Sequence, residues 1–188
     1  MNVFAVKGLP EVRSGDDLAA LIADRTDPRP DDVVCVASTV VSKAEGRRAD
    51  LADFPAGERA RSIAERVGAA ADEQKDPRFA QAVIEESEEF LVEFPIMLAV
   101  TRFGHVTVNA GIDRSNVPGA DLLLLPEDPG ASARRLHERL DARVIVTDTS
   151  GRPFRYGQRG VALGPPAGRP TRGQRRAGRT GTAVPTCR

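Results

Sequence analysis

The sequence has little cysteine and no long hydrophobic run. Its two cysteines, Cys35 and Cys187, are far apart in the chain, which fits neither a disulfide framework nor a zinc site. No apolar stretch approaches the roughly 20 residues that would cross a bilayer. The N-terminus lacks the basic head and cleavage site of a signal peptide. These absences lead us to expect a soluble, cytoplasmic protein that does not insert into membranes.

Acidic residues are absent from the last part of the chain. Residues 151–188 contain nine arginines and no acid, whereas residues 1–150 contain all 27 acids against 18 bases, of which 3 are lysines. The formal net charge of zero therefore combines an acidic body with a basic tail. An acidic surface poor in lysine suits a high-salt cytosol, although a GC-rich genome would also favour arginine over lysine. A halophilic source is our interpretation of this pattern.

The hydrophobic pattern predicts an α+β fold. At 188 residues the chain is long enough for one good core, or for two small subdomains that share one. Because the strands outnumber the helices that could cross between them, mixed β-sheets with flanking helices are favoured over a doubly wound parallel sheet. We predict strands at residues 3–6, 33–37 (buried, with Cys35 inside), 95–102, 105–109, 121–125 and 143–147, and helices from an N-cap at Ser14, after Ser38, and over 56–73, 77–90 and 131–140.

Polar side chains are concentrated in the segment Gly104–Val117. An apolar strand there runs into a glycine turn that presents Asp113 and Asn116 together. Glycine lets a backbone approach a ligand closely, and polar groups just past a strand end converge on the crevice where open sheets bind ligands. The segment therefore predicts a phosphate or metal site.

Two more strand ends carry similar groups. Ser38 and Thr39 follow one predicted strand, with Lys43 one helical turn later, and Asp148 with Thr149 ends another. Taken alone, Ser38 would be a helix cap, Lys43 a solvated lysine and Asp148 a turn residue. Together, hydroxyls and a cation fit phosphate, and two aspartates supply hard oxygen ligands that fit magnesium or manganese.

Other ionisable residues are weaker candidates. His105 begins a predicted strand beside the glycine turn, and His137 lies on a charged helix face. The acidic run 85–89 could chelate a cation. It lies on a predicted helix whose other face is apolar, so a solvated face is the favoured interpretation.

Five segments occur in the order and spacing of one known family. They are Gly8–Glu11, Ser38–Gly46, Asn109–Val117, Leu125–Pro129 followed by Ser132 and Ala133, and Thr147–Pro153. From its start to about Leu163 the chain resembles the coenzyme F420-0:L-glutamate ligase family. The third and fifth segments are quite specific to that family.

The resemblance implies a reaction and a fold. Family members use GTP, Mg²⁺ or Mn²⁺, and K⁺ to join L-glutamate to the deazaflavin precursor F420-0 by an amide bond, releasing GDP and phosphate. They are intertwined α+β homodimers with the nucleotide near the subunit interface. The residues that match the family's GTP-contacting positions are Leu9, Pro10, Glu11, Val12, Ser38, Thr39, Lys43 and Asn116. Those that match its metal ligands are Asp113, Asp148 and Thr149.

The chemistry of the residues is compatible with that assignment. A carboxylate is a poor acceptor for an amine, and phosphorylation by GTP would convert it to an acyl phosphate that the amine of glutamate attacks. Such a reaction needs positioned cations and metal ligands. It needs no covalent nucleophile from the protein, and we assign none.

The sequence departs from the family pattern after Leu163. Of residues 164–188, 15 are Gly, Pro or Arg, and none is aromatic, Leu or Ile. We expect an incomplete ligase-like domain over 1–163 and a disordered tail over 164–188. The family would continue with further elements, another metal ligand and part of the nucleotide pocket. A frameshift in a GC-rich gene is our hypothesis for the change.

Two alternatives remain open. One is a catalytically inactive, truncated product that retains partial GTP and metal binding, with poor solubility from exposed apolar surface. The other is a nucleic-acid-binding module that uses the arginine-rich tail. The acidic body and the absence of aromatic residues for base stacking in the tail argue against the second.

Overall fold

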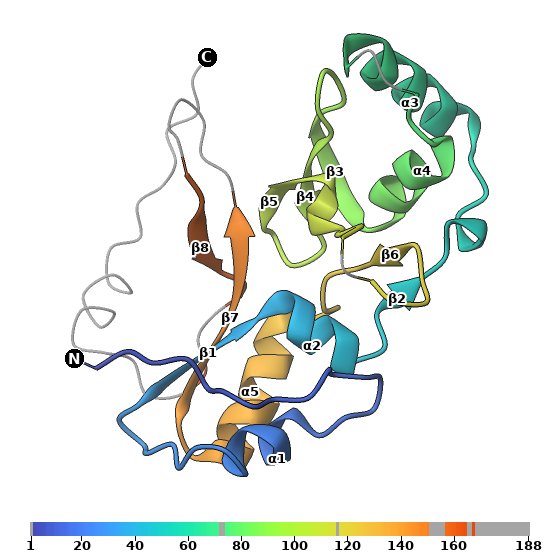
Figure 1. Cartoon of the computed structure of the whole chain (residues 1–188). Coiled ribbons are helices and arrows are strands. Elements are labelled where there is room, and N and C mark those ends of the chain that lie inside the picture. Colours follow the sequence, from blue (N-terminus) through green and yellow to red (C-terminus); the bar gives the residue numbers. More distant parts are fainter. Residues whose placement is uncertain (1, 72–73, 116, 151–156, 165–166, 168–188) are drawn as a thin grey trace, which may run out of the picture.

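Two separate hydrophobic cores organise the chain, and each lies against its own small sheet. Figure 1 shows the two sheets. The structure is a computed structural model and describes residues 2–71, 74–115, 117–150, 157–164 and 167. The helices in this part of the chain are α1 (Leu18–Ala23), α2 (Ser38–Ala44), α3 (Glu58–Ala71), α4 (Pro77–Glu85) and α5 (Pro129–Leu140), with short 3₁₀ turns η1 (Leu51–Asp53) and η2 (Asn109–Gly111). The strands are β1 (Val33–Ala37), β2 (Arg48–Ala49), β3 (Ser87–Val92), β4 (Leu98–Thr101), β5 (Val106–Val108), β6 (Leu122–Leu123), β7 (Arg143–Ser150) and β8 (Arg159–Ala162).

The molecule has two structural halves, one around each core. The first half, which combines segments from both ends of the chain, contains a mixed sheet with the strand order β1-β7-β8. Strand β1 runs parallel to β7, and β8 runs antiparallel to it. Val36, Val144 and Val146 of this sheet are buried in the first core. Helices α1 and α5 contribute Leu18 and Leu136 to the same core. The prediction of a mixed sheet with flanking helices is confirmed.

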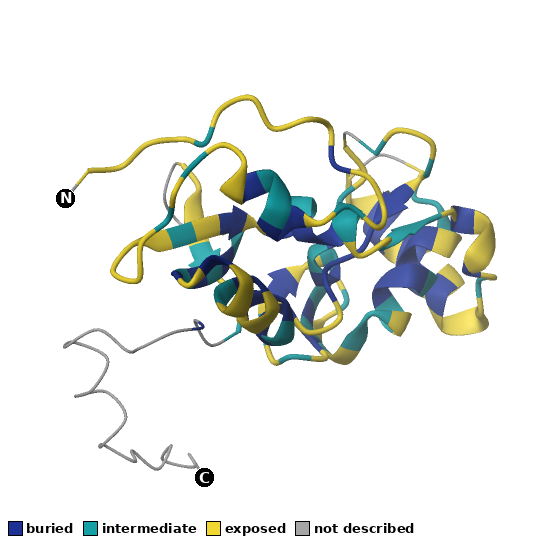
Figure 2. Ribbon diagram, turned by 90° about the horizontal axis from the view of Figure 1, so that it is seen from below, coloured by how far each residue is buried: buried dark blue, intermediate teal, exposed yellow. Residues whose placement is uncertain are grey.

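The second half is an antiparallel sheet, β3-β4-β5, packed on α3 and α4. Helix α3 buries Ile63 and Val67, and α4 buries Phe79 and Val83. These positions are spaced four residues apart, so they form one apolar stripe on each helix. Figure 2 shows the buried stripes facing inward and the opposite faces exposed.

A short ladder joins the halves. Strand β2 pairs with β6, and Figure 1 shows this pair between the two larger sheets. Leu122 and Leu124 belong to the second core, whereas Leu125 belongs to the first. The segment 122–125 therefore passes from one core to the other, which fixes it on both sides.

Aspartates cap three of the helices. Asp17, Asp76 and Asp128 are the N-caps of α1, α4 and α5, and each side chain accepts a hydrogen bond from a backbone N–H of the first turn. The predicted cap at Ser14 is wrong, because α1 begins only at Leu18. Proline follows the cap in α4 and α5, where its missing N–H has no cost.

The expected first strand at residues 3–6 is not a strand in the structure. Residues 2–10 adopt neither helix nor strand, and Val3 and Phe4 are 83% and 74% exposed. An alternating pattern gives a strand only when a neighbouring strand pairs with it. None of the described strands pairs with this segment.

The expected helix over 77–90 ends early. Helix α4 stops at Glu85, Glu86 is its C-cap, and the chain continues as β3, which pairs with β4. Ser87, Glu88 and Glu89 thus lie on a strand and not on an acidic helix face. The branched and aromatic residues that follow favour this strand, and pairing with β4 satisfies its backbone groups.

The remaining predicted elements are present with shifted bounds: most are shorter, but β7 continues to Ser150 and α5 begins at Pro129. The strands expected at 95–102, 105–109, 121–125 and 143–147 correspond to β4, β5, β6 and β7, and β1 occupies the range predicted for it. Cys35 is exposed, however, because only one face of β1 is covered. None of the described helices has the length and apolar character needed to cross a membrane.

Removal of the Asp128 cap should destabilise the first half. In Asp128→Ala the N–H of Ala131 loses its acceptor, now 2.8 Å away. We expect the free energy of unfolding to fall by about 1 kcal/mol in urea titrations. Asp128→Asn keeps an acceptor and should recover most of the loss. An equal loss in Glu138→Ala, at an exposed position of the same helix, would contradict the capping role.

Candidate functional site

A cavity of about 570 Å³ has walls from both halves of the molecule. The first half contributes the start of α2 and the end of β7, and the second half contributes β5. The segments around Asp113 and Leu124 complete the wall. Five of the residues predicted for the site line this one cavity: Ser38, Thr39, Asp113, Asp148 and Thr149.

Strand pairing brings Ser38 and Asp148 together. Ala37 pairs with Thr147 in the parallel ladder, so Ser38, which follows β1, lies beside Asp148. Asp148 is still inside β7 and pairs with Val161 of β8, so the expectations that the strand ends at Thr147 and that Asp148 is a turn residue are wrong. The Ser38 hydroxyl, buried at 1% exposure, donates a hydrogen bond of 2.9 Å to Oδ1 of Asp148. The alternative of Ser38 as a helix cap is wrong, because the N-cap is Ala37 and makes no side-chain cap bond.

Asp113 is held by backbone geometry. It follows three successive residues with positive φ, Asn109 (55°), Ala110 (51°) and Gly111 (72°). Asp113 and Leu123 then exchange backbone hydrogen bonds of 3.0 and 2.8 Å. The backbone N–H and the hydroxyl of Ser115 both donate to Oδ1 of Asp113 at 2.7 Å. The turn therefore presents this carboxylate to the cavity in a defined orientation.

The donor set of the cavity consists of oxygen atoms. Asp113 and Asp148 supply carboxylates, and Thr149 supplies a hydroxyl. Magnesium and manganese prefer such ligands and often complete their coordination with phosphate oxygens and water. No group of three or more His, Cys, Asp or Glu side chains gathers within the described residues. The residues present therefore fit a divalent metal held jointly with a phosphate ligand, and do not fit a zinc site.

The other predicted nucleotide residues lie elsewhere. Leu9, Pro10 and Glu11 are exposed in the N-terminal segment, whose Gly8 carbonyl accepts a 2.7 Å hydrogen bond from Arg25. Val12 is buried in the first core. Neither these residues nor Lys43 are among the described residues that line the cavity. Asn116 falls outside the described residues.

The structure adds cavity residues that the sequence reasoning missed. Ser42 is 1% exposed, and its hydroxyl has no hydrogen-bond partner among the described residues. It follows Ser38 by four positions, so helical spacing was a usable signal. Thr107 lines the cavity from the inner face of β5, between exposed Val106 and Val108. Gln158 also lines it, and we find no sequence signal for that residue.

His105 lies beside the site and does not line it. Burial lowers the pKa of its imidazole, and the negative charge of Asp148 acts in the opposite direction. Its Nε2 atom is buried without a partner in the described part of the chain, and its ring stacks on Phe103 with centroids 6.5 Å apart. These surroundings favour the neutral ring.

Known proteins match this chain over most of its length. The family model described as F420-0:Gamma-glutamyl ligase matches residues 8–182. The chain belongs to the F420-0:gamma-glutamyl ligase family. Membership identifies it as a ligase, as the motifs predicted.

Archaeal members of the F420-0:gamma-glutamyl ligase family are close in sequence. The coenzyme F420:L-glutamate ligase of Natronomonas pharaonis is 67% identical over 177 residues, which cover 93% of this chain and 70% of the relative. That of Halorubrum lacusprofundi is 64% identical, over 93% of this chain and 71% of its own. The enzyme of Archaeoglobus fulgidus is 49% identical, and the aligned part covers 87% of this chain and 66% of the relative.

The match to the F420-0:gamma-glutamyl ligase family passes Leu163, where the sequence resemblance was expected to end. Ala167 lies beyond that residue, exchanges backbone hydrogen bonds with Val144 and is buried in the first core. Ordered contacts therefore extend at least to Ala167. Residues 168–188 fall outside the described part of the chain, so the disordered tail stays a prediction.

Substitution of Gly111 by alanine tests the packing behind Asp113. A Cβ added to Gly111 would lie 2.4 Å from Cδ1 of Leu125, whereas a Cβ on Gly119, also at positive φ, would meet nothing within 4 Å. Both alanine variants acquire backbone strain of about 1 kcal/mol, and Gly111→Ala adds an overpacking cost of about 1–3 kcal/mol. Thermal or urea unfolding should rank Gly111→Ala clearly below Gly119→Ala. Equal stabilities would show that Leu125 moves aside freely.

His105 should make stability depend on pH in weak acid. Its folded pKa is lowered from 6.5, so the unfolded chain binds the proton first as the pH falls. The stability that comes from the neutral ring is complete above pH 6.5 and is lost below it. Urea titrations from pH 7.5 to 5.5 should show a smaller decline in His105→Gln than in the original chain. An identical decline would contradict the buried neutral ring.

Proposed function

We propose that the cavity catalyses GTP-dependent addition of L-glutamate to coenzyme F420-0, with release of GDP and phosphate. The observation that carries the proposal is the meeting of Asp113 from one half with Ser38 and Asp148 from the other in one cavity. Family membership supports the overall reaction. The relatives named above are called coenzyme F420:L-glutamate ligases, which supports these substrates.

The roles of the residues follow from their chemistry. Asp113, Asp148 and Thr149 would hold Mg²⁺ or Mn²⁺, which when bound neutralises phosphate charge during transfer. Ser38 and Thr39 line the same cavity and would donate hydrogen bonds to phosphate oxygens. The substrate carboxylate is phosphorylated by GTP, and the amine of glutamate displaces phosphate from the acyl phosphate. The protein orients these groups and supplies no covalent nucleophile.

The remaining assignments belong to the same proposal. Lys43 would supply a cation to the phosphates, and the segment 9–12 with Asn116 would contact the rest of the nucleotide. K⁺ as a further cation and a homodimeric assembly complete it. Their support is the resemblance of the motifs to the family.

Asp113→Asn tests the proposed metal ligand. The amide keeps an acceptor for Ser115 but loses the negative charge that a divalent cation needs. We expect GDP release, dependent on F420-0 and glutamate, to fall at least about 100-fold at saturating Mn²⁺. Asp24→Asn, at a surface position with a 73% exposed side chain, is the matched control.

The outcomes separate the open alternatives. Unchanged turnover in Asp113→Asn at saturating metal would remove Asp113 from the ligands. Binding of GTP and Mn²⁺ by the original chain without turnover would favour the catalytically inactive product. The matching substitution in the Natronomonas pharaonis relative then shows whether the aspartate is required in a longer family member.

A further inference from the structure

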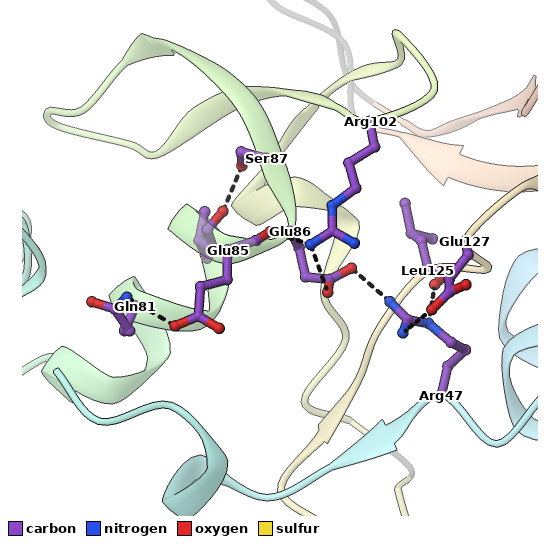
Figure 3. Close-up of polar contacts among 9 residues, drawn as sticks. Arg47, Gln81, Glu85, Glu86, Ser87, Arg102, Leu125 and Glu127 are labelled. Carbon is purple, nitrogen blue, oxygen red and sulfur yellow. Dashed lines mark hydrogen bonds and ion pairs between the residues drawn. The ribbon is translucent and has the colours of Figure 1, made fainter.

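Arg47 joins three segments beside the cavity (Figure 3). Its Nε donates to the carbonyl of Leu125 at 2.8 Å, and its Nη2 donates to Glu86 at 2.7 Å. Its Nη1 donates to Glu127 at 3.3 Å. The side chains of Arg47 and Glu86 are only 16% and 15% exposed, whereas that of Glu127 is 73% exposed. The bonds to Leu125 and Glu86 therefore dominate, because solvent weakens the third.

The backbone of Arg47 makes further connections. Its N–H donates to the carbonyl of Ser42 in α2 at 2.9 Å, and its carbonyl accepts from Leu124 at 2.9 Å. Both Ser42 and Leu124 line the cavity. Arg47 thus links the helix on one wall to the segment on the other while lying outside the lining itself.

The segment that Arg47 holds also holds Asp113. Leu123 exchanges two backbone hydrogen bonds with Asp113, and the side chain of Leu125 fills the space beside Gly111. A shift of residues 123–125 would therefore move the Asp113 backbone with it. The path from Arg47 to Asp113 thus runs through its hydrogen bonds to Leu124 and Leu125, the backbone of residues 123–125, and the two hydrogen bonds between Leu123 and Asp113.

We propose that Arg47 is a positioning residue of the ligase reaction. Its guanidinium fixes the segment 123–125, and this segment fixes Asp113 where a divalent metal and GTP bind together. The inference rests on the proposed function and extends it to a residue that does not contact the substrates. Arginine is required because its planar fork donates in several fixed directions at once, and a lysine ammonium does not reproduce that geometry.

A merely stabilising role makes a different prediction. The pair of Arg47 and Glu86 ties α4 to the middle ladder, so its loss lowers the melting temperature whether or not Asp113 moves. Glu86→Gln weakens the charge pair but leaves the bond from Arg47 to Leu125. Arg47→Lys keeps the charge and loses that bond. The two variants separate stability from positioning.

The test measures Mn²⁺ affinity in the presence of GTP, from the electron paramagnetic resonance signal of free Mn²⁺. The full chain is used at a temperature where circular dichroism shows every variant to be folded. Arg47→Lys should weaken Mn²⁺ binding about 10-fold, and exchange of the Asp113 and Leu123 amide hydrogens should accelerate. Glu86→Gln should lower the melting temperature without changing Mn²⁺ affinity.

Arg143→Lys is the control for loss of a partly buried arginine. Arg143 is the first residue of β7, at the opposite end of the strand from Asp148. Its side chain is 24% exposed and donates a hydrogen bond to Asp31. We expect no change in Mn²⁺ affinity in this control.

Unchanged Mn²⁺ affinity and unchanged amide exchange in Arg47→Lys would overturn the inference and leave Arg47 a stabilising residue. An equal affinity loss in Glu86→Gln would overturn it as well. If the original chain binds no Mn²⁺ with GTP, the proposed metal site fails. In that case the amide-exchange rates of Asp113 and Leu123 in Arg47→Lys alone decide whether Arg47 holds residues 123–125 in place.

Discussion

The parallel pairing of β1 with β7 is the constraint on which the site depends. Val36 and Val146 pair and are buried in the first core, and one step later Ala37 pairs with Thr147. A slip of one residue would turn the valines of β7 outward, which costs about 1.5–3 kcal/mol for each side chain. The bond from Ser38 to the Asp148 carboxylate contributes about 1.5–3 kcal/mol, which is less than the two buried valines of β7 contribute together. Hydrophobic burial therefore sets the register, and the polar contact follows from it.

The opposite wall depends on contacts between the two halves. Leu122 and Leu124 are buried in the second core and Leu125 in the first, so residues 122–125 stay in place only while both cores are packed. The partly buried pair of Arg47 and Glu86 crosses the same boundary. A buried ion pair adds little net stability, because desolvation offsets attraction, but it penalises arrangements that separate the charges. The contribution of this pair is then to fix how the halves are arranged.

Much of the site could be predicted because strand ends carry a local signal. Ser38 follows β1, Asp148 lies near the C-terminal end of β7, and Asp113 follows the turn after β5. The ends of paired strands lie close together in a sheet. The strand order was not predictable, because β1 and β7 are separated by roughly one hundred residues. No local pattern indicates which strands pair with each other. Glu86 and Ser87 were misassigned because helical spacing continues past Glu85, whereas pairing with β4 decides the conformation. Arg47 was overlooked because its partners are distant in sequence.

The left-handed turn before Asp113 has a consequence for binding. Asn109, Ala110 and Gly111 adopt a backbone shape that L-residues other than glycine rarely take. The conformational entropy of this shape is lost when the chain folds, so a ligand does not need to order it again. The site is preorganised at the cost of local strain. Looser packing around the turn would then weaken ligand affinity even where every liganding atom is retained.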